Sequence, residues 1–469
     1  MSNRFSRRDF LRAGLAAAAC TGLGLPGPVR DAYAADSFGL TQPFFANLML
    51  NGGPDMRHLL MPPMSSQSAS YGQRFWRARV RSQGIDDTLS AMDTRWQQDY
   101  LPVSDGTTNF GILARCGWLY DMWEAGKVAF VCGVLVDSSR DHELAQRSMN
   151  MGNRSSSKVS YGNGWGGRLA EAADCNVLAL TNSPRRFSFG PDPADLANPD
   201  KIDMRRVIPM SDAREFGLPE ADSDPDWFHD YLMRGLRHYY GERRKTIGKA
   251  SVYRQLFDNE RKLRELGGVV DARLAQAPAT PGLDALFNDG SVGYELALMA
   301  RNLYDALFMH DVLNTRIASL EYGANWDTHD AQRAEIEPNL ANLFGRDGAL
   351  AALHAELPAD ARAQLTLLIG GEFGRQLADN GGRGTDHGEG TVMIVIGEQV
   401  RGGVYGTMFP EEELERLDEP SADIHGVNGI EHLFGAISDW LQPGAGNLVF
   451  PDRASAPLEA GVDLGGIFA

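Results

Sequence analysis

Short apolar segments followed by polar clusters recur along the chain. Five of them are rich in Val, Ile and Leu, and most are followed by Gly, Asn or Asp: Phe44–Leu50, Val128–Val136, Arg316–Leu320, Leu365–Ile369 and Thr391–Ile396. Apolar runs of this length, bounded by turn residues, are typical of strands that are buried on both faces of a parallel sheet. We therefore predict five central parallel strands.

Helical periodicity fills the segments between these runs. Apolar residues recur at helical spacing over Leu113–Ala125, Ser291–Leu313, Glu335–Leu357 and Ile430–Leu441. Strands that alternate with helices predict a doubly wound α/β/α sandwich. Residues 185–290 differ, because they are first rich in Pro and acidic residues and then strongly helical from about Asp226 to Gln276. We predict a mainly helical insertion or cap there.

Residues 1–34 contain the three parts of a twin-arginine export signal. The segment Ser6-Arg7-Arg8-Asp9-Phe10-Leu11-Arg12 resembles the twin-arginine consensus, an apolar stretch follows, and Ala32-Tyr33-Ala34 is a small-x-small cleavage signal. The apolar stretch is too short to span a bilayer comfortably. We expect export to the periplasm or the medium, and a single mature domain over 35–469 without a stable membrane span. Acylation of Cys20 is an open alternative.

The charge of the chain bears on its partners, and its cysteine content bears on disulfide bonds. The chain carries a formal charge of −17, from 62 acidic and 45 basic residues. An acidic surface repels phosphate backbones, so we expect no nucleic-acid partner. Beyond the signal, Cys116, Cys132 and Cys175 form an odd and widely spaced set. Such a set does not make a disulfide framework, so we expect buried apolar cysteines with at most one bridge.

Carboxylates and imidazoles lie beside the ends of successive predicted strands. They follow the first, third and fourth strands, or lie in the glycine-rich loop before the fifth: Asp55, Asp327, His329, Glu372, Asp386 and His387. In open α/β sheets, ligands bind outside the carboxyl ends of the strands. Carboxylates and imidazoles without thiolates are ligands for Zn, Mn, Mg or Ca, and several carboxylates in one cleft repel one another unless a cation is present. We therefore predict that these six residues bind divalent metal ions.

Several of these residues have a simpler structural interpretation. A single Asp after a strand is commonly a turn or cap residue, and Asp327 to His329 is also compatible with a helix N-cap. The segment His142-Glu143-Leu-Ala-Gln146 has Gln where the zinc-protease motif HExxH has its second His. We therefore do not assign that motif.

Taken together, the motifs resemble the bacterial domain-of-unknown-function family 1501, which is similar to the alkaline phosphatase and sulfatase superfamily. The resemblance rests on four segments: Gly52-Gly53-Pro54-Asp55, Ser139-Arg140-Asp141-His142, Asn325-Trp326-Asp327-Thr328-His329, and Glu372-Phe373-Gly374-Arg375 with the later Asp386-His387 pair. It implies a sandwich of the alkaline-phosphatase type and two divalent ions. It also implies hydrolysis of phosphate or sulfate esters, either as small molecules or linked to polysaccharide.

The resemblance also implies a position for the nucleophile, and there this chain departs from the family. The family usually has Ser where this chain has Asp141. The candidate catalytic residues are therefore Asp141, Ser139 and His142, with Ser138 as an alternative nucleophile. Phe373 also replaces a His that phosphatases place after that strand. These two departures support the alternative hypothesis of a non-catalytic exported protein that binds metal or has a structural role.

Overall fold

The computed structural model describes residues 37–154, 162–192 except 182, 202–215, 238, 266–417 except 291, 419 and 421–468. The predicted export signal and most of the segment 226–276 lie outside these residues. Within the part that is described, none of the helices has the length and apolar character needed to cross a membrane.

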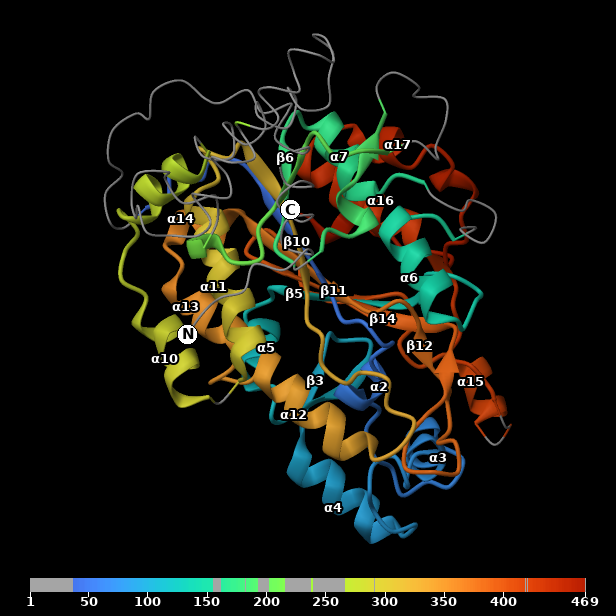
Figure 1. The fold of residues 1–469 in the computed structure, drawn as a ribbon. Coiled ribbons are helices and arrows are strands. Elements are labelled where there is room, and N and C mark those ends of the chain that lie inside the picture. Colours follow the sequence, from blue (N-terminus) through green and yellow to red (C-terminus); the bar gives the residue numbers. More distant parts are fainter. Residues whose placement is uncertain are drawn as a thin grey trace.

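A nine-stranded sheet forms the centre of the molecule (Figure 1). Its strands follow the order β15-β5-β14-β11-β1-β10-β6-β9, and β16 pairs with the end of β5. The strands are β1 Phe44–Met49, β5 Val128–Leu135, β6 Asn176–Ala179, β9 Val207–Pro209, β10 Thr315–Glu321, β11 Leu365–Gly370, β14 Gly390–Gly397, β15 Gly403–Tyr405 and β16 Asn428–Gly429. All five predicted strands are present in it. β9, from the predicted insertion, forms one edge.

One strand of this sheet runs against the others. β14 is antiparallel to both of its neighbours, β11 and β5, whereas the other strand pairs of the sheet are parallel. The prediction of a parallel strand at Thr391–Ile396 is therefore wrong, and the sheet is mixed. Because of the reversal, the beginning of β14 lies at the carboxyl ends of the parallel strands, where Gly390 pairs with Leu135. A residue just before β14 thus reaches the same edge as residues that follow β10 or β11.

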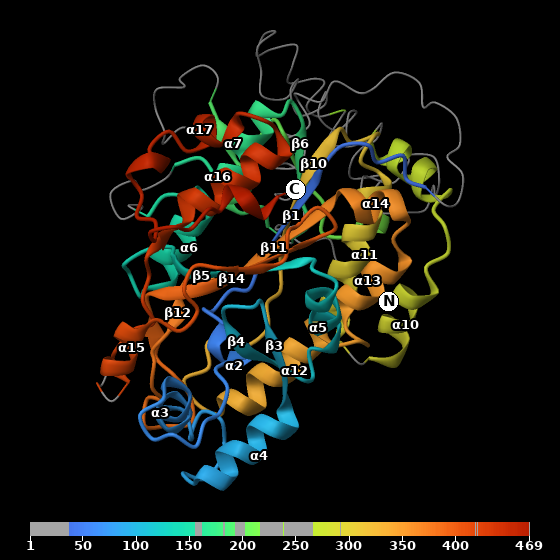
Figure 2. The same ribbon diagram turned by 180° about the vertical axis from the view of Figure 1, so that it is seen from behind.

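Helices cover both faces of the sheet (Figures 1 and 2). The alternating side chains of β1 enter two separate cores, since Phe44 and Leu48 belong to one and Phe45 and Met49 to the other. The second core is closed by α7 Trp165–Ala172, α16 Ile430–Leu441 and α17 Ala445–Val449. The first is closed by α5 Gly117–Glu124, α11 Tyr294–Phe308, α12 Gln332–Phe344 and α13 Ala349–Glu356. The protein is thus a mixed α/β fold with helices on both sides of its sheet.

The predicted helices are present with some changes of bounds. α16 matches the predicted segment, whereas the single helix expected over Glu335–Leu357 is divided into α12 and α13 around Gly345. The other helices are α2 Met56–Leu59, α3 Tyr71–Ala78, α4 Leu89–Asp99, α6 His142–Met151, α10 Pro281–Asp289, α14 Ala359–Gln364 and α15 Glu411–Arg416. Cys116, Cys132 and Cys175 are buried, as predicted, and all three are free, so the bridge left open above is not formed among them.

Three small sheets complete the described structure. They consist of β2 Leu60–Met61, β4 Asn109–Leu113 and β3 Tyr100–Ser104 in one sheet, β12 Gly374–Arg375 with β13 His387–Gly388, and β7 Gly190–Pro191 with β8 Ile202–Asp203. The β12–β13 pair matters for the site, because it fixes the loop between β11 and β14 in an antiparallel hairpin in which Arg375 pairs with His387.

Candidate metal centre

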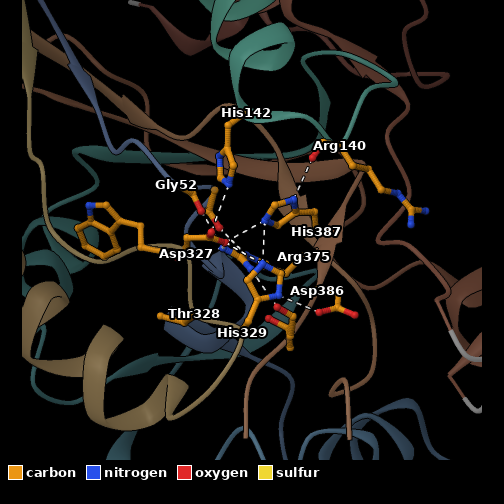
Figure 3. A network of polar contacts seen from close by, with 12 residues as sticks. Gly52, Arg140, His142, Asp327, Thr328, His329, Arg375, Asp386 and His387 are labelled. Carbon is orange, nitrogen blue, oxygen red and sulfur yellow. Dashed lines mark hydrogen bonds and ion pairs between the residues drawn. The ribbon is translucent and has the colours of Figure 1, made fainter. Parts of the chain in front are cut away.

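Four side chains meet at the edge of the sheet where its parallel strands end (Figure 3). Asp327 and His329 lie in the loop after β10, and His142 is the first residue of α6, shortly after β5. His387 lies in β13, just before β14. The reversed direction of β14 is what brings this last histidine to the same edge as the other three residues.

The local structure around His142 is fixed by a helix cap. The Asp141 side chain is the N-cap of α6, and its Oδ1 accepts a hydrogen bond from the Leu144 amide at 3.0 Å. The Ser139 hydroxyl in turn accepts from the Asp141 amide at 3.1 Å. Asp141 is exposed. Both predicted catalytic oxygens therefore support the turn that presents His142.

Asp327 is the residue on which the histidines converge. Its Oδ1 lies 2.8 Å from Nε2 of His387 and 3.0 Å from Nε2 of His329, and its Oδ2 lies 3.3 Å from Nε2 of His142. The Nε2 atoms of His329 and His387 are 3.0 Å apart. Ligand atoms about 2.0–2.1 Å from a tetrahedral Zn²⁺ ion are about 3.3 Å from one another. The separations in this centre are close to that value.

The second ring nitrogen of each histidine is oriented by an oxygen acceptor. The pairs are His142 Nδ1 with Glu372 Oε1 at 2.7 Å, His329 Nδ1 with Asp386 Oδ1 at 2.8 Å, and His387 Nδ1 with the carbonyl oxygen of Arg140 at 2.9 Å. An ionised carboxylate or a carbonyl only accepts hydrogen bonds, so each Nδ1 carries the hydrogen. In a neutral imidazole this leaves a lone pair on Nε2, directed at Asp327.

Lone pairs therefore face lone pairs in this cluster. Such an arrangement is repulsive unless a proton or a cation lies between the atoms. Three imidazoles and one carboxylate are ligands that Zn²⁺ and other hydrolytic ions accept, and a carboxylate or carbonyl behind each histidine is the usual support of a metal ligand. The ligand atoms of His142, Asp327 and His387 all lie within 4.8 Å of one another. These residues fit a bound divalent ion.

The carboxylates of the centre are held in their ionised form. Burial alone would raise the pKa of Asp327, but its contacts with the His387 ring and the Arg375 guanidinium outweigh burial and lower the pKa to about 2. Burial would likewise raise the pKa of Glu372, yet the hydrogen bond from His142 and those from backbone amides lower it. The same contact with Glu372 raises the pKa of His142. The centre thus presents negative charge at neutral pH.

Arg375 ties together the loops that form the centre. Its buried guanidinium donates to Asp327 Oδ1 at 2.8 Å, and also to the carbonyl oxygens of Gly52, Gly53, Trp326 and Thr385. The loops after β1, after β10 and before β14 are therefore held by one side chain. The sequence motif contained this arginine but gave no role for it.

The two glycines after β1 form a binding site for the Glu372 carboxylate. The amides of Gly52 and Gly53 donate to it at 3.0–3.2 Å. Gly53 has a φ of +62°, and a Cβ added to it would lie 2.2 Å from a ring carbon of Phe373. Only glycine fits there without a shift of that ring. Gln146 is a fourth partner of Glu372, at 3.1 Å, one helical turn after His142 on the same face of α6.

The structure divides the six predicted metal residues into three groups. Asp327, His329 and His387 meet at the centre, together with His142, which was predicted as catalytic. Glu372 and Asp386 lie behind His142 and His329 and orient them. Asp55 is elsewhere: it is the buried N-cap of α2, forms an ion pair with Arg79, and accepts from Gln332 at 2.8 Å.

The fold and the site define a mixed α/β protein with a candidate metal centre at the carboxyl edge of its sheet. The chain belongs to DUF1501, a family described as proteins of unknown function, which matches residues 124–411. The four residues of the centre lie inside this match, whereas Asp55 lies before it. No curated protein and no solved structure matches the chain.

Proposed function

We propose that the protein is an exported, metal-dependent hydrolase of phosphate or sulfate esters, with a fold of the alkaline-phosphatase type. One observation carries the proposal: three imidazole Nε2 atoms, each with its Nδ1 hydrogen already engaged, are directed at the carboxylate of Asp327. The ester class comes from the resemblance to the superfamily. Localisation in the periplasm or outside the cell comes from the twin-arginine segment.

We assign His142, Asp327 and His387 as the metal ligands. Three protein ligands leave a coordination position open for substrate or water, as catalytic sites require. A divalent ion bound there would polarise the ester oxygen and lower the pKa of a water molecule. The resemblance implies two such ions, and the gathered ligand set accounts for one of them.

His329 is the candidate general base. Asp386 fixes its Nδ1 hydrogen at 2.8 Å, so its Nε2 is available to take a proton from water beside the ligands. The side chain is partly exposed, which leaves room for a substrate to approach. We propose water as the nucleophile, because Asp141 caps α6 and the Ser139 hydroxyl supports the preceding turn.

The test is metal content combined with turnover. Purified wild-type protein, His387→Ala and the matched control His432→Ala are analysed for bound metals, and a panel of aryl phosphates and sulfates is assayed. His432 lies on α16 and binds the Ala456 carbonyl oxygen at 3.1 Å, away from the centre. We expect about one divalent ion per chain in wild type and control, and a loss of affinity of more than about 100-fold in His387→Ala, together with loss of turnover.

Two other outcomes decide against the proposal. Equal metal content in all three proteins would show that His387 is not a metal ligand and that the metal binds outside this centre. Metal bound by wild type and control without turnover of any ester would favour the non-catalytic alternative. Asp141 in place of the family's Ser supports that alternative, because it removes a hydroxyl from the expected nucleophile position.

A further inference from the structure

A pocket of about 360 Å³ lies beside the loops of the metal centre, and arginines dominate its lining. They are Arg81, Arg115, Arg333 and Arg383, and Glu337 is the one acidic residue that lines it. We propose that this arginine pocket binds an oxyanion group, such as a sulfate or phosphate, carried on a ligand of the size of a sugar. The volume is in the range of pockets that hold small organic ligands.

The charge of the pocket contrasts with that of the chain. The whole protein has a formal charge of −17, yet four guanidinium groups and one carboxylate share this pocket. A concave surface lined by one sign of charge raises the local concentration of oppositely charged ligands. Guanidinium groups also match the geometry of sulfate, phosphate and carboxylate oxygens, to which they donate in pairs.

Two of the lining arginines have guanidinium N–H groups that are only weakly engaged by carboxylates. Arg115 and Arg383 have side chains that are 63% and 71% exposed. The nearest carboxylates, Glu337 and Asp330, are 3.7 Å and 3.5 Å from their Nε atoms. Contacts of this length are not well-formed hydrogen bonds, and exposed ion pairs of this kind contribute little. A ligand can therefore engage these guanidinium groups at small cost.

Glu337 does not cancel the positive charge, because it is compensated from the interior. Its carboxylate is almost fully buried and pairs with Arg95. It also accepts from Nε2 of His58 at 3.1 Å, while Gln83 donates to the other nitrogen of that ring at 3.0 Å. Three further carboxylates lie near the pocket arginines: Asp99, at 3.5 Å from Arg333, Asp330, and Asp379, which accepts from the Arg81 amide at 3.2 Å. Of these four acids, Glu337 is the one that lines the pocket.

The pocket and the metal centre share the same loops. The backbone amide of Gln332 donates to the carbonyl oxygen of Arg383 at 2.9 Å, and Asn380 donates to that of His329 at 2.9 Å. Arg81 donates to the carbonyl oxygen of Gly381 at 2.8 Å. A ligand in the pocket therefore contacts the segments that carry His329 and His387. The proposal that the pocket binds an anion does not depend on the proposed function. The proposal that this anion belongs to the substrate of the metal centre rests on the proposed function.

The experiment is calorimetric titration with a disulfated disaccharide and with the same disaccharide without sulfate. Arg115→Gln with Arg383→Gln is compared with the control pair Arg205→Gln with Arg401→Gln, which removes the same charge from exposed residues near the two edges of the sheet. We expect only the sulfated sugar to bind, at least about tenfold weaker affinity in the pocket variant, and a change within about twofold in the control.

The same titration of His387→Ala separates this proposal from the proposed function. Retained affinity in that variant supports the arginine pocket, even if no protein turns over any ester. Loss of affinity would locate the sulfate at the metal centre and overturn the pocket. Absence of binding to wild type, equal binding of the uncharged sugar, or an equal loss in the control pair would also overturn it.

Discussion

Two clusters of polar side chains lie near the carboxyl edge of the sheet. They differ in whether each carboxylate is paired with hydrogen-bond donors. We call the first cluster the Asp55–Glu337 network. In it Asp55 accepts hydrogen bonds from Arg79 and Gln332, and Glu337 accepts from Arg95 and His58. In the candidate metal centre, three imidazole nitrogens with lone pairs face the carboxylate of Asp327.

Exposure separates the two clusters as well. The side chain of Asp55 is fully buried, whereas those of Asp327 and His329 are 39% and 43% exposed. Buried polar groups must be satisfied within the protein, so the network has to be complete as it stands. The centre is open to solvent and can obtain a missing cation from it. We infer that the network serves stability, whereas the centre serves binding.

The largest expected effect comes from breaking the network. Asp55→Ala leaves the Arg79 guanidinium buried without its carboxylate, so we expect the free energy of unfolding to fall by about 3–5 kcal/mol. Asp327→Asn keeps an oxygen that accepts from Arg375, and should cost less than about 1 kcal/mol in metal-free protein. Urea unfolding of both variants measures the difference. The opposite ranking would contradict the division of roles between the two clusters.

Metal should stabilise the protein through the centre only. At a free metal concentration of about 100 times the dissociation constant, we expect the free energy of unfolding to rise by about 2.7 kcal/mol. His387→Ala should show no rise, and His432→Ala should behave as wild type. Urea unfolding with and without a chelator provides the comparison. An equal rise in His387→Ala would indicate that the metal binds elsewhere.

Acid should weaken the network through Glu337. Burial would raise the pKa of this residue, but the hydrogen bond from His58 and the charges of His58 and Arg95 lower it from 4.5 to about 2. A lowered folded-state pKa gives stability that is present above pH 4.5 and is lost as the pH falls toward 2. Between pH 5 and pH 3, wild type should lose about 2 kcal/mol more than Glu337→Gln. Identical pH profiles for the two proteins would contradict this.

The smallest expected effect is at the residue that departs from the family. Asp141→Ser keeps a side chain that caps α6, so the free energy of unfolding should change by less than about 0.5 kcal/mol. Metal content should stay the same, because Asp141 is exposed and its Oδ1 is bonded to the Leu144 amide. A loss of metal in this variant would return Asp141 to the ligand set.

The strands were predictable from sequence, but their directions were not. Each of the five short apolar runs forms a strand, because a strand covered by helices on both faces of the sheet buries every side chain. That same burial removes the alternation of polar and apolar residues, and the apolar run of β14 reads the same in either direction. The sequence pattern also does not indicate that Glu335–Leu357 is divided into two helices, because apolar residues continue at helical spacing on both sides of Gly345.

Residue types at strand ends identified most of the site, but not which residues face each other. Glu372 and Asp386 were predicted as ligands because they are carboxylates beside strands, and a carboxylate that orients a histidine has the same sequence signature. The partner of Asp55, Arg79, lies on the turn after α3 and has no local signal. The capping role of Asp141 was readable, since Asp directly before a helical segment is a common N-cap.

The reversed strand also affects the order in which the chain can assemble. β11 and β14 are joined by residues 371–389, whereas β1 and β10 pair residue 45 with residue 317. The entropy cost of closing a loop grows with its length, so the shorter hairpin is favoured to form first. It carries Glu372, Arg375 and His387 on one continuous segment. His387 and two residues that support the centre, Glu372 and Arg375, are therefore encoded as a local folding unit, and Asp327 joins them when the distant strands pair. Amide-exchange protection during refolding would report this order.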